Sequence, residues 1–164
     1  KSIALKGDEV LPVFFAQWGD GKIGLYMTPW GDERSKQATL LALKLAFAAR
    51  GVESYVMVNE AWCVRRDKDH DFDTALPPSQ CEDREEILLI TGVSHGGVIG
   101  ASAKLGRDAD NKRTVGELEW IDAEVAGRMV ELLPPEGRPA APQHVIDEIE
   151  SMIGMKLEDF PSIH

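Results

Sequence analysis

One stretch of the chain, residues 53–65, limits the possible folds most strongly because it is apolar on both sides. Side chains of a β-strand alternate between two faces. One face here carries Val56, Val58, Trp62 and Val64, and the other carries Tyr55, Met57, Ala61 and Cys63. A strand of this kind belongs in the middle of a sheet with protein packed on each side. Glu60 interrupts the first face, so we expect its carboxylate to be largely desolvated and to need a partner or a proton.

Two predicted elements precede this strand. Residues 10–18 and 22–28 are rich in β-forming side chains and flank a Gly-Asp-Gly turn, which predicts a hairpin. Residues 32–50 predict a helix, with Asp32 as its N-cap and Gly51 directly after its last residue. Helical spacing of apolar residues predicts a buried stripe of Ala38, Leu41, Leu45 and Ala48, which Leu40, Leu43 and Phe47 widen.

Three further strands and two further helices are predicted after the central strand. The strands cover residues 85–93, 98–105 and 113–120, and short turns between them indicate an antiparallel meander. The helices cover residues 122–133 and about 143–153. The sequence therefore predicts an α+β fold in the order ββαββββαα. Its curled, mainly antiparallel sheet of five to six strands is packed by a central helix and by C-terminal helices.

Length and composition agree with one folded unit. A chain of 164 residues buries roughly 70% of the surface that its unfolded form exposes. We expect residues 1–133 to form a single α+β domain, residues 134–142 a proline-rich linker, and residues 143–164 a C-terminal amphipathic helix and tail. A helix this short is marginal alone, so it must dock on its own domain or on a neighbouring subunit.

The acidic charge argues against several classes of partner. The formal net charge is −10, whereas nucleic-acid binding needs clustered Lys and Arg against the phosphates. No apolar run approaches the ~18 to 20 residues of a membrane span, and residues 1–6 show no secretory signal. Cys63 and Cys81 are too few for a disulfide framework. We therefore expect a cytoplasmic protein that binds neither nucleic acid nor membrane.

The strongest candidate site surrounds Glu60. If residues 85–93 pair antiparallel with the central strand, Arg84 and Glu85 lie near the strand end that carries Trp62 and Arg65. One interpretation is a structural ion-pair network that satisfies Glu60. The other is a poised carboxyl group that acts as a general acid or base, beside an arginine that orients an anionic ligand.

His95 is a further candidate, because histidine titrates near neutral pH and two glycines follow it. No nucleophile with a matching base accompanies it, so a residue of a hairpin turn is the favoured interpretation. The four histidines are too dispersed for a shared metal site. The acids of residues 67–73 alternate as in a calcium loop, but Phe72 and Pro78 stand where that loop needs Gly and Glu. We predict no metal and no cofactor.

One local pattern resembles other sequences. Asn59-Glu-Ala-Trp62, followed by Pro78-Ser79 and then Arg84-Glu85, is similar to a pattern in uncharacterised bacterial and phage-encoded proteins. In these proteins a Glu-Ala-Trp strand precedes a Pro-Ser loop and an Arg-Glu strand start. The resemblance covers residues 53–93 and implies no activity. It implies that the loop and both strand ends form one unit.

Three functions remain open at this point. The absence of a catalytic motif and the presence of a separable amphipathic helix favour a non-catalytic, acidic binding or assembly module. We expect it to form homo-oligomers through the C-terminal helix or a sheet edge. The first alternative is a small enzyme, or a binding protein for an anionic or aromatic small molecule, that uses Glu60 and Arg84. The second alternative is an inhibitor that mimics nucleic acid. The sequence indicates neither a substrate nor an oligomer size.

Overall fold

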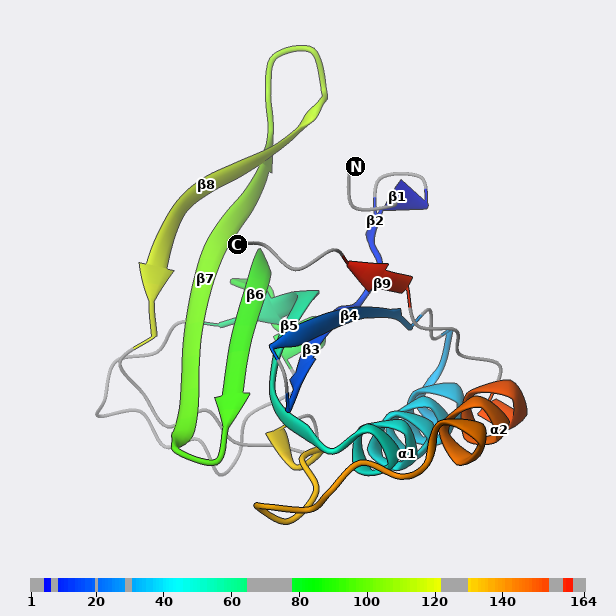
Figure 1. The fold of residues 1–164 in the computed structure, drawn as a ribbon. Coiled ribbons are helices and arrows are strands. Elements are labelled where there is room, and N and C mark those ends of the chain that lie inside the picture. Colours follow the sequence, from blue (N-terminus) through cyan, green and yellow to red (C-terminus); the bar gives the residue numbers. More distant parts are fainter. Residues whose placement is uncertain are drawn as a thin grey trace.

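Two helices cover one part of an open, curled antiparallel sheet, so the protein is an α+β fold (Figure 1). The structure, a computed structural model, describes residues 5–6, 9–19, 21–28, 31–64, 78–121, 130–153 and 158–160. Its elements in chain order are β1 (Leu5–Lys6), β2 (Glu9–Val10), β3 (Val13–Trp18), β4 (Lys22–Met27), α1 (Glu33–Arg50), β5 (Val52–Cys63), η2 (Pro78–Gln80), β6 (Glu85–Ser94), β7 (Gly97–Arg107), β8 (Arg113–Trp120), α2 (Gln143–Ile153) and β9 (Glu158–Phe160).

The sheet has the order β8-β7-β6-β5-β3-β4-β9, and each neighbouring pair is antiparallel. The predicted order of strands and helices is confirmed for the hairpin, the first helix, the central strand and the meander. The predicted helix over 122–133 falls mainly on residues 122–129, which lie outside the described residues, and residues 131–133 are not helical. Within the described part of the chain, neither helix combines the length and the apolar character needed to cross a membrane.

Helix α1 begins and ends where the sequence predicts. The Asp32 carboxylate accepts a hydrogen bond from the Ser35 N–H at 2.7 Å, and the Ser35 hydroxyl oxygen accepts one from the Asp32 N–H at 3.0 Å. This reciprocal capping box satisfies two N–H groups at the start of the helix. At the other end, Gly51 adopts a left-handed φ of 63°, and its N–H donates to the Phe47 carbonyl.

Replacing Asp32 with alanine is expected to lower the Tm at neutral pH and to have less effect in acid. Hydrogen bonds from Ser35 lower the pKa of Asp32 from its ordinary value of 3.8. A carboxylate whose pKa is lowered by folding stabilises the native state above the unfolded-state pKa, and that stabilisation is lost as pH falls through the folded-state pKa. The Tm difference between wild type and Asp32→Ala should therefore narrow from neutral pH into acid. A constant difference would contradict this account of the N-cap.

The core lies between α1 and the part of the sheet formed by β3, β4 and β5 (Figure 1). The Phe47 ring of α1 is fully buried. Its centroid lies 6.4 Å from that of Phe14, 5.5 Å from that of Tyr26 and 5.3 Å from that of Tyr55. One helical side chain therefore contacts aromatic rings from three strands.

The buried face of α1 differs from the predicted stripe. Leu41 and Leu45 are 62% and 48% exposed, whereas Leu40, Leu43 and Phe47 are buried. The helix is apolar around much of its circumference, so periodicity alone does not determine which face meets the sheet. The aromatic rings of the strands select the face that carries Phe47.

Helix α2 docks on α1 of the same chain (Figure 1). Ile146 of α2 is buried, and the Arg50 Nε of α1 donates to Glu150 Oε1 at 2.6 Å. The Ala141 N–H donates to the Ala49 carbonyl at 2.7 Å. The proline-rich residues 134–142 are therefore held against the end of α1, and α2 uses its buried side within its own chain.

Candidate functional site

The candidate site lies on the face of the sheet that points away from α1. Strands β5 and β6 pair from Ser54 opposite Ser94 to Cys63 opposite Glu85. Tyr55 and Met57 point into the core that α1 covers. Since side chains alternate along a strand, Glu60 points to the other face.

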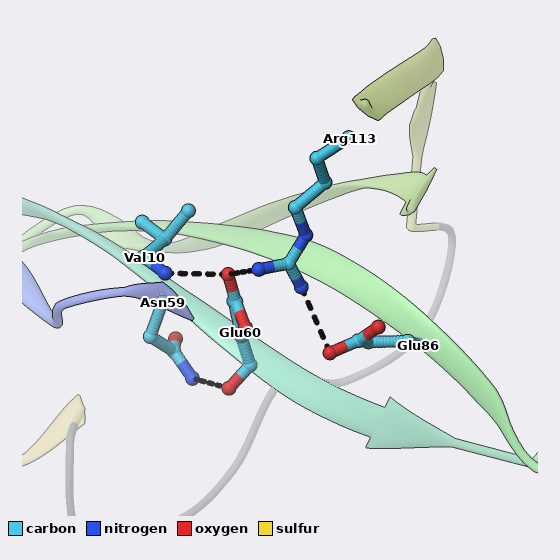
Figure 2. A network of polar contacts seen from close by, with 5 residues as sticks. All are labelled: Val10, Asn59, Glu60, Glu86 and Arg113. Carbon is cyan, nitrogen blue, oxygen red and sulfur yellow. Dashed lines mark hydrogen bonds and ion pairs between the residues drawn. The ribbon is translucent and has the colours of Figure 1, made fainter. Parts of the chain in front are cut away.

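Glu60 is bound by a cation and by a backbone amide (Figure 2). Arg113 Nη1 lies 2.7 Å from Glu60 Oε1, and the Val10 N–H donates to the same oxygen. Arg113 Nη2 also lies 2.8 Å from Glu86 Oε1. The Glu60 and Arg113 side chains are only 15% and 16% exposed. The hydrogen bond to Glu60 is the main cause that raises the pKa of Arg113.

The curl of the sheet makes this contact possible. Arg113 begins β8, which is three strands away from β5. Neighbouring strands lie about 4.8 Å apart, so a flat sheet would separate β8 from β5 by about 14 Å. That distance exceeds the reach of one arginine side chain, so β7 and β8 must bend toward the Glu60 face. The ion pair therefore joins β8 to β5 across the curl as well as satisfying Glu60.

Arg84 and Trp62 form a separate contact near the same strand end. The Arg84 guanidinium carbon lies 4.7 Å from the centre of the Trp62 ring, which is a cation–π arrangement. Arg84 also donates to the Ser79 carbonyl. Among the described residues, the ion-pair partner of Glu60 is therefore Arg113, and Arg84 packs on the half-exposed Trp62.

The other predicted site residues do not join Glu60. Glu85 is opposite Cys63, so it points to the α1 face, where it pairs with the Lys104 Nζ at 2.6 Å. His95 is exposed in the turn after β6, at the opposite end of that strand. Arg65 lies outside the described residues, as does the calcium-like segment 67–73. Of the predicted site residues that the structure describes, Glu60, Trp62, Arg84 and Glu85 therefore lie near one strand end, and His95 lies at the other.

The sequence contains a signal that points to Arg113. In an antiparallel meander, the end of β5, the start of β6, the end of β7 and the start of β8 lie at the same end of the sheet. Arg113 is the first residue of β8 and Glu86 is near the start of β6. The sequence order shows only that these residues lie at the same end of the sheet. It does not show that they touch, because the curl that brings β8 over β5 is a property of the whole sheet.

Chemically, this arrangement is a clamp that joins β2, β5, β6 and β8. The Arg113 guanidinium compensates the charge of Glu60. This geometry matches the interpretation of Glu60 as a member of a structural ion-pair network. Asn59 Nδ2 donates to the Glu60 carbonyl at 2.9 Å, and among the described residues no hydrogen-bond partner reaches the buried Asn59 Oδ1 and Thr91 Oγ1. In the described part of the chain, no three His, Cys, Asp or Glu side chains are grouped so that they could hold a metal ion.

Two pockets lined by described residues lie away from this clamp. One, of about 410 Å³, is at the turn between β6 and β7 and has Val56 and Ile99 in its lining. The other, of about 540 Å³, is at the C-terminal end of α1 and includes Trp18, Arg50 and Arg138. Glu60 lines neither of them.

No protein-family model, no curated protein and no solved structure matches the chain. Function is therefore inferred from the residues and from their arrangement.

Proposed function

We propose that the protein is a non-catalytic binding module that associates with a second copy of itself through the β7–β8 edge of its sheet. The observation that carries this proposal is a group of large apolar side chains exposed at that edge. We call it the β7–β8 patch, and its members are Ile99, Val115, Leu118 and Trp120, which are between 52% and 73% exposed. Contiguous apolar patches of more than a few hundred Å² are uncommon on monomers and mark interaction surfaces.

The strand register places the four side chains of the patch on one face. Residues opposite one another in a sheet share a face, and the pairs here are Ala101 with Trp120, Ala103 with Leu118, and Leu105 with Val115. Between the last two pairs the register shifts, so β8 carries one extra residue there. Without that bulge, Val115 and Leu118 would point to opposite faces. Ile99 precedes Ala101 by two residues and therefore points the same way.

The free edge of β8 is complementary to a second copy of itself. In the described sheet β8 is the terminal strand and has only β7 beside it. The chain passes from basic Lys112, directly before β8, to acidic Glu117 near the end of the strand. A two-fold axis that sets β8 antiparallel to its copy places the basic end of one strand beside the acidic end of the other.

Other features of the chain favour this proposal over the alternatives. The apolar side of α2 packs on α1 of the same chain. Of the two contacts expected between copies, the sheet edge is therefore the better candidate. Glu60, Glu85 and Glu150 are paired with cations, which disfavours both a poised acid and a mimic of nucleic-acid phosphates. Cys63 and Cys81 are not joined by a disulfide, which agrees with a location in the reducing cytoplasm.

The substitution Trp120→Glu is expected to leave the protein monomeric at concentrations at which the wild type associates. It removes the largest apolar side chain of the patch and puts a hydrated carboxylate in its place, so the apolar area that the contact buries is lost. The matched control is Met152→Glu on α2, because Met152 and Trp120 are both 73% exposed. Sedimentation velocity of the two variants should show association of Met152→Glu alone. Association of Trp120→Glu, or its loss in Met152→Glu, would contradict the proposed contact.

A further inference from the structure

We propose that the cleft of about 540 Å³ at the C-terminal end of α1 binds a small anion that carries a carboxylate or phosphate group. Three segments far apart in the sequence line it: the turn between β3 and β4, the end of α1 with the start of β5, and the residues before and at the start of α2. This cleft is separate from both the Glu60 clamp and the β7–β8 patch. The inference therefore does not depend on self-association.

The charge of the lining is opposite to that of the chain. The chain has 18 basic and 28 acidic residues. Among the described residues, the lining of the cleft includes the cations Lys22, Arg50 and Arg138 and one acid, Glu53. Glu150 compensates Arg50 at 2.6 Å, so we assign the main ligand contact to the exposed Arg138. A cleft concentrates the field of such charges and attracts anions from solution.

The backbone holds the segment that carries Arg138 in a defined position. The Arg138 N–H donates to the Pro135 carbonyl at 3.2 Å, and the Ala141 N–H donates to the Ala49 carbonyl at 2.7 Å. A Cβ placed on Gly51 would lie 2.9 Å from the Arg138 carbonyl oxygen. The segment can therefore approach the end of α1 only because residue 51 is glycine. Arg138 is brought to the cleft by this packing.

The remaining walls suit an anion with an organic part. Trp18 is 9% exposed, and the Arg50 guanidinium carbon lies 4.9 Å from the centre of its ring. This contact fixes Arg50 against an apolar surface inside the lining. Gln143 also lines the cleft and donates from its amide to Asp147 Oδ1 at 2.7 Å, while the first turn of α2 contains no acidic residue. The cleft thus offers the exposed Arg138 guanidinium beside a wall that Trp18 and Arg50 hold in place.

The experiment measures the Tm and the binding heat of the full chain with three probes: inorganic phosphate, citrate and adenosine monophosphate. Sodium chloride at equal ionic strength is the reference. We expect at least one probe to raise the Tm in a saturable way. Arg138→Glu should weaken the binding of that probe about tenfold or more, because one charge-assisted hydrogen bond to the anion is lost. Phosphate and citrate separate phosphate recognition from carboxylate recognition.

The matched control is Arg34→Glu, which makes the same charge change at the opposite, exposed end of α1. This variant should bind the probe as the wild type does. The absence of any saturable rise above the chloride reference would overturn the proposal. Equal weakening in Arg138→Glu and Arg34→Glu would overturn it too, because it would show a general charge effect. Trp120→Glu should retain the binding, which separates this test from that of self-association.

Discussion

Truncation of Phe47 to alanine is expected to lower the free energy of unfolding by about 3 to 5 kcal/mol. The ring is completely buried and contacts aromatic rings on β3, β4 and β5. Its removal leaves a cavity that neighbouring rings fill poorly, because their own packing fixes them. Urea denaturation monitored by circular dichroism measures the change, provided that the slope of the transition stays the same.

The control for this prediction is Leu41→Ala on the same helix. Leu41 is 62% exposed, so its truncation should change the free energy of unfolding by no more than about 0.5 kcal/mol. This comparison also tests which face of α1 meets the sheet. A cost for Leu41→Ala equal to that for Phe47→Ala would show that the helix docks through the stripe that helical spacing predicts.

The substitution Arg113→Met is expected to lower the free energy of unfolding by about 2 to 4 kcal/mol, somewhat less than for a fully buried pair. Met keeps much of the length of the arginine side chain but removes the charge, so Glu60 stays largely buried without a cation. The effect should also loosen the curl, because Arg113 is the contact that joins β8 to β5. Urea denaturation gives the energy, and hydrogen exchange of the β8 amides reports the loosening.

Two further variants separate this ion pair from a general loss of charge. Lys104→Met breaks the pair with Glu85, but Lys104 is 63% exposed, so the expected cost is below about 1 kcal/mol. In the double variant Glu60→Gln/Arg113→Met, part of the loss should be recovered, with a coupling of about 1 to 3 kcal/mol. The single variant Glu60→Gln completes this double-mutant cycle, and additive effects of Glu60→Gln and Arg113→Met would show that their ion pair does not stabilise the fold.

Local signals in the sequence predict most of the elements of the fold. Asp32 and Gly51 mark the ends of α1, because capping and left-handed backbone depend on residues that lie next to each other in the chain. The Gly-Asp-Gly turn marks the β3–β4 hairpin for the same reason. Alternation in residues 53–65 identifies a central strand, and β5 indeed has β3 and β6 on its two sides.

Features that depend on several elements could not be predicted in this way. The partner of Glu60 is Arg113, because the sheet curls until β8 reaches β5, and no local pattern encodes that curvature. The buried face of α1 depends on aromatic rings contributed by three strands. The position of Arg138 depends on the approach of its backbone to Gly51, which is visible only after both segments are folded. The bulge that aligns Val115 with Leu118 likewise requires the paired strand β7.

Self-association through the β7–β8 patch is the central claim, and sedimentation equilibrium of the wild-type chain tests it most directly. The mass of one chain is 18.1 kDa. We expect the weight-average mass to rise with protein concentration from 18.1 kDa toward twice that value, as for a closed two-fold dimer. A mass that stays at 18.1 kDa up to the highest soluble concentration would contradict the claim.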